Sequence, residues 1–138
     1  CQSMRKAYLE KISSDYGQIA ETLKNLYKTK QFNEFESKLA EVLKSSGEKY
    51  SNGVYIPLKR TGNFYSCFIE QISLIKDTIW LDVYCQGDLS DTTEELKLSD
   101  LLKRGKVRLT YKNEGFTVDD DSINDMIDDL AEYLKEKK

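Results

Sequence analysis

Residues 78–86 read TIWLDVYCQ, and apolar core-type side chains fill every second position of this stretch. Successive side chains of a β-strand point to opposite faces of its sheet, so this alternation predicts a half-buried strand. The face expected in the core carries Ile79, Leu81, Val83 and Cys85. The opposite face carries Thr78, Trp80, Asp82, Tyr84 and Gln86. The stretch therefore predicts a sheet with one face in the core and another that presents larger aromatic and polar groups.

Further antiparallel strands are predicted on both sides of this stretch. Two runs rich in β-branched and aromatic residues, 54–56 and 64–75, precede it. Lys76-Asp77 is short enough for a hairpin turn, and Pro57 confines the first strand to an edge or a bulge because proline has no N–H to donate. Residues 106–118 alternate again around a turn. We therefore expect an antiparallel sheet of about five strands, formed by a meander and a hairpin.

Helical periodicity marks both ends of the chain. Apolar residues recur at spacings of three and four from Leu9 to Leu26, and again from Phe32 to Leu43, where Ser45-Ser46-Gly47 ends the pattern. These two segments predict an amino-terminal helical hairpin. A third apolar stripe from Ile123 to Leu134 predicts a carboxy-terminal helix.

A short additional helix is expected between the strands. Residues 91–95 read DTTEE, and Thr92 and Glu95 have the spacing of a capping box at a helix amino terminus. Gly105 is placed to end that helix. The whole order of elements is typical of an α+β fold in which helices cover one face of an antiparallel sheet.

The domain organisation and the amino terminus leave alternatives open. We expect a single domain over residues 4–138, with a division near Gly47 as the alternative. Cys1-Gln2-Ser3 resembles the remnant of a protease site ahead of a start at Met4, which favours a cytoplasmic protein. Alternatively, Cys1 is the lipidated cysteine of a bacterial envelope lipoprotein, whose ligand the sequence does not identify.

Composition narrows the classes of function. The 138 residues carry a formal net charge of −3, which favours solubility, and no apolar run approaches the roughly 20 residues of a membrane span. The sequence contains no histidine, so triads and metal sites that use histidine are excluded. Neither GxGxxG nor GxxxxGK[ST] occurs. These absences predict a protein that is not an enzyme and binds no cofactor and no metal.

Carboxylate chemistry is the one catalytic alternative, because paired acidic residues can act without histidine. Glu70 and Asp82 lie on adjoining predicted strands, where they can approach each other. The competing interpretation is that both side chains point into water on an open face, since such residues are rarely buried.

An acidic cluster begins the carboxy-terminal helix. From residue 119 onward the chain has eight acidic and three basic residues, a local charge of −5. No EF-hand fits, because the glycine and glutamate that such a loop requires are not at the right positions. Helix capping and a solvated acidic face, which can engage a basic partner, explain the cluster. Its aspartates are Asp119, Asp120, Asp121, Asp125, Asp128 and Asp129.

A basic stretch precedes it. Between residues 96 and 112, six basic residues accompany a single acidic residue, Asp100, and Tyr111 adds an aromatic surface. Such a stretch can contact a nucleic-acid backbone, but proteins that bind nucleic acid usually carry a larger basic excess. We therefore expect no nucleic-acid partner.

Aromatic side chains gather on the predicted strands. Tyrosine and tryptophan are enriched at interfaces, where they bury a ring and keep a polar group accessible; the alternative is that helices cover both faces of the sheet and these rings fill core. The favoured hypothesis is a noncatalytic protein-binding module of bacterial type that docks a basic protein and acts by occlusion. A toxin-neutralising immunity protein fits this description in size, charge and architecture. The expected partner-binding residues are Trp80, Asp82, Tyr84, Asp121, Asp125, Asp128 and Asp129.

The cysteines give one further expectation. Cys67 and Cys85 lie on neighbouring strands, opposite each other if the turn has three residues and on different faces if it has two. A disulfide between them would indicate export, whereas two thiols would indicate a reducing compartment. We favour thiols.

Overall fold

The computed structural model describes residues 17–58, 67–87 and 91–136. Helical residues 17–28 come first, and the elements that follow combine helices with antiparallel strands, which confirms the predicted α+β class. In chain order they are α2 (Phe32–Ser46), β1 (Glu48–Lys49), β2 (Val54–Pro57), β3 (Cys67–Ile75), β4 (Thr78–Gln86), β5 (Asp91–Lys97), α3 (Leu98–Arg104), β6 (Val107–Tyr111), β7 (Glu114–Val118) and α4 (Asp120–Glu136).

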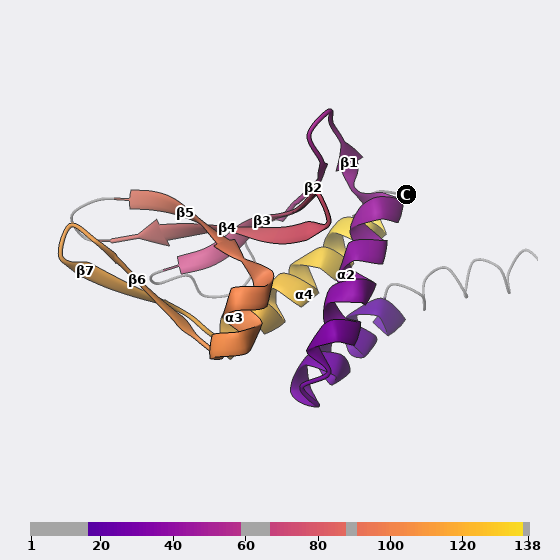
Figure 1. The fold of residues 1–138 in the computed structure, drawn as a ribbon, viewed down its shortest axis with the longest axis horizontal. Helices are drawn as coiled ribbons and strands as arrows, with labels where there is room; N and C mark the ends of the chain where they lie inside the picture. Colours follow the sequence, from indigo (N-terminus) through magenta and orange to yellow (C-terminus); the bar gives the residue numbers. More distant parts are fainter. Residues whose placement is uncertain (1–16, 59–66, 88–90, 137–138) are drawn as a thin grey trace, which may run out of the picture.

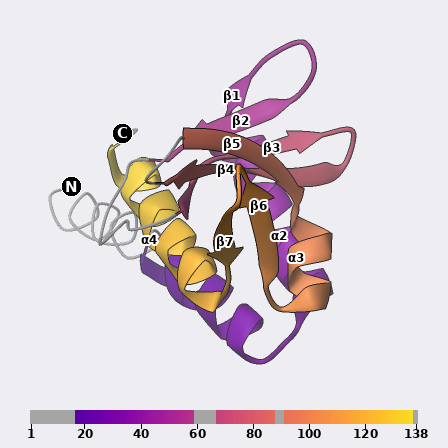
Figure 2. The same cartoon turned by 90° about the vertical axis from the view of Figure 1, so that its left-hand side faces the viewer.

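The strands of the described ranges form two antiparallel sheets. One has five strands in the order β1-β2-β3-β4-β5, and β6 and β7 form the other as a hairpin. Figures 1 and 2 show that α2, α3, α4 and the β6–β7 hairpin all lie on one side of the larger sheet. Within the described part of the chain, no helix or strand covers its other side. This arrangement leaves one sheet face outside the core.

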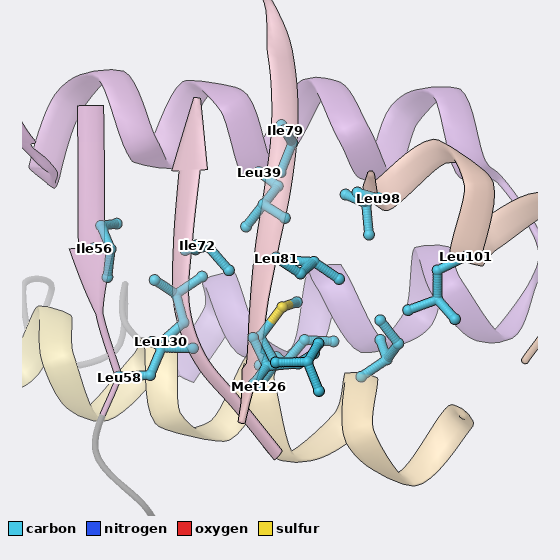
Figure 3. Packing of buried hydrophobic residues seen from close by; sticks show 14 of the residues in the cluster. Leu39, Ile56, Leu58, Ile72, Ile79, Leu81, Leu98, Leu101, Met126 and Leu130 are labelled. Carbon is cyan, nitrogen blue, oxygen red and sulfur yellow. The ribbon is translucent and has the colours of Figure 1, made fainter. Parts of the chain in front are cut away.

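The core lies between the larger sheet and the helices. All four β4 residues predicted to face inward are buried, as is the apolar stripe of α4. Leu39 of α2, Leu101 of α3 and Met126 of α4 pack from three helices onto the same sheet face (Figure 3). Each such buried side chain contributes roughly 1.5–3 kcal/mol to folding. The inward side chains therefore hold β4 firmly in the core.

The end of α2 is fixed by a close approach of backbone to sheet. Gly47 follows the last residue of the helix, and its N–H donates to the Leu43 carbonyl. A Cβ at this position would lie 2.7 Å from the Leu43 carbonyl oxygen and would collide with the Val54 side chain. Only glycine fits there without a shift of the β2 strand, and the predicted helix end is confirmed.

The segment 91–97 differs from its prediction. It is the strand β5 and not a helix start, and the capping box of Thr92 and Glu95 does not form. Its side chains alternate between exposed and half-buried, a period of two, and seven residues pair with β4. That ladder outweighs a local capping preference worth about 1 kcal/mol. The helix begins instead at Leu98 and ends, as expected, at Gly105, whose φ is 80°.

The composition of the larger sheet also differs in detail. The hairpin at 107–118 does not join the larger sheet. The fourth and fifth strands of that sheet are instead β5 and the two-residue β1. Pairing of β1 with β2 stops at Tyr55, so Pro57 lies beyond that ladder, as the absence of its N–H requires.

A β-bulge decides the register of β3 and β4. The turn has two residues, Lys76-Asp77, both with positive φ, which by itself would place Cys67 and Cys85 on different faces. The bulge between Ile69 and Gln71 shifts the register by one residue, so Cys67 and Cys85 occupy directly opposite positions on the two strands. The side chain of Cys67 is outside what the structure describes, and the bonding of the pair stays a prediction.

Several expectations fall outside the described ranges. They concern Cys1 and its lipidation, the first half of the first helix, and the start of the strand expected from residue 64. In the part of the chain that is described, no helix combines the length and the apolar character needed to cross a membrane.

Candidate binding face

The side of the larger sheet that no described helix or strand covers is named here the open face. The strand register aligns its side chains in rows that run across β2, β3, β4 and β5. One row contains Tyr55, Ser73, Trp80 and Lys97, and the next contains Pro57, Gln71, Asp82 and Glu95. Tyr84 follows one step further along β4. The three β4 residues predicted for partner binding therefore share this face.

Aromatic rings extend across the open face. Trp80 and Tyr84 are half-buried on β4, and Lys97 places its Nζ 5.6 Å from the Trp80 ring centroid. Towards β1, the rings of Tyr50 and Tyr55 meet edge to face at 5.3 Å, and Tyr50 is 61 % exposed. Rings that are held in place but partly accessible can bury further area against another surface at little cost in conformational entropy.

The face is not uniformly accessible. Over β3, Ser73 and Phe68 are only 3 % and 6 % exposed, and the Phe68 ring packs 5.2 Å from that of Tyr84. Over β5, in contrast, every residue that points to this side from Asp91 to Glu95 is exposed. Accessible area is thus concentrated over β4 and β5.

Carboxylates surround Asp82. Burial, followed by the neighbouring Glu95 and Glu70 carboxylates, raises the pKa of Asp82 above its ordinary value, and the Gln71 side chain opposes this by donating from Nε2 to Asp82 Oδ2 at 3.0 Å. Asp82 and Glu95 are direct cross-strand partners. The structure therefore brings Glu70 near Asp82, as the catalytic alternative from the sequence required, and adds Glu95.

The Asp91 carboxylate lies at the end of the open face. The Tyr84 hydroxyl donates to Asp91 Oδ2 at 2.6 Å, which connects β4 to the first residue of β5. This contact holds the Tyr84 ring at the edge of the accessible area.

The α4 aspartates predicted for partner binding have three different environments. Asp121 and Asp125 are exposed. The Asp125 carboxyl group is still partly shielded from water, and this shielding, followed by the Asp128 and Asp121 carboxylates, raises its pKa. Asp128 forms an ion pair of 2.6 Å with Lys24 Nζ. Asp129 is only 5 % exposed, so it does not belong to an accessible acidic surface.

The two predicted groups of binding residues lie on opposite sides of the sheet. Helix α4 packs beneath the sheet, whereas Trp80, Asp82 and Tyr84 face away from it (Figure 2). The structure does not bring them into one surface, and a partner that covers the open face leaves α4 uncovered.

The acidic residues of the described ranges form no group of three or more potential ligands arranged around a metal ion. The expected capping role of the first aspartates is confirmed, since the Asp121 N–H donates to Asp119 Oδ1 at 3.1 Å. Calcium is therefore not needed to explain why this segment is acidic.

Sequence reasoning missed two residues of the open face. Glu95 was assigned to a helix start, and Tyr50 was given no role. Residues 91–97 read DTTEELK, which has no apolar alternation, so the sequence held no strand signal for the first. Comparison of the chain with family models, with curated proteins and with solved structures found no match.

Proposed function

We propose that this chain is a noncatalytic protein-binding module that docks a basic partner on the open face. The observation that carries the proposal is the combination, on one uncovered sheet face, of half-buried aromatic rings with the carboxylates of Asp82, Glu95 and Asp91. Aromatic residues supply buried area at interfaces, and complementary charge supplies specificity and a fast association rate.

The cost of this arrangement supports a role in binding. Like charges directly opposite each other on neighbouring strands destabilise a sheet. Burial is the largest cause of the raised pKa of Asp82, and repulsion by Glu95 and Glu70 adds to it. Local features that lower stability without a compensating contact are expected at functional sites. A lysine or arginine of a partner placed between Asp82 and Glu95 would remove the repulsion.

Occlusion is the mode of action that this surface favours. A rigid sheet face anchored by the core can cover an active or binding site of the partner without any reactive group of its own. A toxin-neutralising immunity protein acts in this way, and such a role in a bacterial cytoplasm is part of the proposal.

Capture of the partner from an extract of the source organism tests the proposal. The full chain serves as bait beside Trp80→Ala and Asp82→Asn, with Asp121→Asn as a control that removes the same charge from α4. We expect a basic protein that the wild type and Asp121→Asn retain, and that each open-face variant loses at least tenfold. Circular dichroism verifies that every bait is folded.

Two results would reject the docking face. One is a partner that binds the open-face variants as well as the wild type. The other is a partner lost only with Asp121→Asn, which would place binding on α4. A captured protein of acidic charge would reject the expected complementarity.

A carboxylate enzyme is the second candidate, because one observation favours it. Burial, followed by the Glu95 and Glu70 carboxylates, raises the pKa of Asp82, and a carboxyl group with a raised pKa can serve as a general acid. Turnover of a small glycoside by the purified chain, abolished by Asp82→Asn, would establish it in place of the binding module. Equal background rates for the wild type and Asp82→Asn would exclude the carboxylate enzyme.

A further inference from the structure

A basic pocket of about 860 Å³ lies on the helical side of the molecule, away from the open face. Here it is named the basic pocket, after its five cationic lining residues: Lys24, Lys28, Lys30, Lys103 and Arg104. They come from the first helix, from the turn that follows it and from the end of α3, and Asp120 and Asn124 of α4 line the same pocket.

The charge of the basic pocket is largely uncompensated. Lys24 is paired with Asp128, but Lys28, Lys30, Lys103 and Arg104 form no ion pair with any described residue. Asp120 is the one carboxylate among the described lining residues. It accepts a hydrogen bond of 2.5 Å from the Tyr27 hydroxyl. Burial and this carboxylate raise the pKa of Tyr27 well above its usual range, so the phenol stays a neutral donor.

Helix dipoles explain only part of this positive charge. Lys28 is the last residue of the first helix and Lys30 follows two residues later, and Lys103 and Arg104 occupy the last turn of α3. Each helix end carries the equivalent of about half a negative charge, so two ends offset roughly one cation. The Asp120 carboxylate offsets another, so about two of the four unpaired cations are left over, in a protein whose net charge is −3.

The shape of the basic pocket fits a small ligand. Its volume lies within the roughly 300–1,000 Å³ of pockets that bind small molecules. Phe32, Leu102 and the Tyr27 ring provide an apolar part of the lining, and the Tyr27 and Phe32 rings lie 6.0 Å apart. A ligand for this site combines dense negative charge with a body that tolerates apolar contact.

The geometry points to binding of a small oligophosphate, with three or more negative charges, in the basic pocket. A carboxylate or a monophosphate offers one anionic group to four cations that lie on two segments of the chain, whereas a phosphate chain presents several such groups within a few ångströms. Lysine acts as a point-charge ligand for phosphate, and the single arginine can bind two phosphate oxygens at once. Inorganic tripolyphosphate and a nucleoside triphosphate share this chemistry, and the latter also has a base that can contact the apolar lining.

Titration calorimetry of the full chain at about 150 mM salt tests the inference. Tripolyphosphate, ATP without magnesium, and monophosphate are the probes. We expect tripolyphosphate or ATP to bind at least tenfold more tightly than monophosphate. ATP bound more tightly than tripolyphosphate identifies a nucleotide site, and the reverse identifies an inorganic chain. Either order supports the inference, and failure of both to bind at 1 mM (about −4 kcal/mol) rejects it.

Lys30→Gly gives a variant that separates binding from folding. Lys30 has a φ of 61°, a conformation that glycine adopts without strain, so this change removes a charge and is not expected to lower stability. At about 6 Å and physiological salt, loss of one lysine is expected to weaken a triply charged ligand about fivefold. Lys76→Gly is the matched control, because Lys76 has a φ of 50° in the β3–β4 turn and does not line the pocket.

Two outcomes would overturn the site. Equal losses of affinity in Lys30→Gly and Lys76→Gly would show a general charge effect. A ten-nucleotide single strand that binds at least tenfold more tightly than either oligophosphate, with the same dependence on Lys30, would assign the pocket to a nucleic-acid backbone instead.

Discussion

Replacement of Asp82 by asparagine is predicted to stabilise the protein at neutral pH. The change keeps the size of the side chain, and its amide oxygen can still accept the hydrogen bond from Gln71 Nε2. It removes one of three carboxylates that repel each other across β3, β4 and β5. A residue that lowers stability where it stands is expected to serve another purpose, which under the proposed function is contact with a cationic partner.

The size of the effect follows from the register. Opposite residues of an antiparallel pair have Cβ atoms about 5 Å apart, which places the Asp82 and Glu95 carboxylates roughly 6 Å apart. Two such charges repel by about 0.7 kcal/mol in water and by more on a half-buried face, and salt removes about half. With Glu70 as a second neighbour, relief of repulsion amounts to about 1 kcal/mol, or about 3 °C in Tm.

The stability gained by Asp82→Asn is expected to depend on pH. Because the pKa of Asp82 is raised in the folded protein, the folded state holds this proton more tightly than the unfolded chain, and stability falls as the pH rises through that pKa. The gain from Asp82→Asn is therefore present at pH 7 and disappears below the ordinary pKa of 3.8. Urea unfolding at pH 7 and at pH 3 measures both values. A loss of stability at pH 7, or an equal gain at both pH values, would refute the repulsion.

Three further predictions concern the fold. Leu81→Ala removes a fully buried side chain of β4 and is expected to cost about 3 kcal/mol, measured by urea unfolding; a cost below 1 kcal/mol would place Leu81 outside the core. Gly47→Ala forces a Cβ against the Val54 side chain and is expected to lower Tm by several degrees in calorimetry, whereas an unchanged Tm would contradict the close approach. Tyr27→Phe removes the hydrogen bond to Asp120 and is expected to cost about 1 kcal/mol in thermal unfolding; no loss would show that water replaces this contact.

Periodicity predicted the parts of the fold in which one face of an element is buried. The alternation of β4 identified all four of its core residues, and the apolar stripe of α4 identified its buried face. These patterns are strong because a shift by one residue would expose the whole apolar set to water.

Pairing between distant segments could not be predicted in the same way. The capping-box pattern at Thr92 and Glu95 is a local signal, and the ladder with β4 that turns 91–97 into a strand forms only in the folded chain. The bulge at Ile69 and Gln71 likewise shows no sequence signature, although it decides which residues of β3 oppose β4.

The candidate site was predicted in part. Trp80, Asp82 and Tyr84 share a face because they alternate along one strand, and this needs no tertiary information. Whether α4 shares that face depends on how the helices pack, and Asp129 is buried by contacts that its sequence neighbours do not reveal. The basic pocket combines residues near 28 with residues near 103, so sequence alone showed only separate lysines.

Trp80 offers the most direct test of docking on the open face, because it is the one tryptophan in the sequence. Chain labelled with 5-fluorotryptophan gives a single ¹⁹F resonance, which can be followed as the unlabelled captured partner is added. We predict that this resonance shifts and saturates with complex formation, and that tripolyphosphate leaves it unchanged. A complex that forms while the Trp80 resonance stays where it was would show that the partner binds elsewhere.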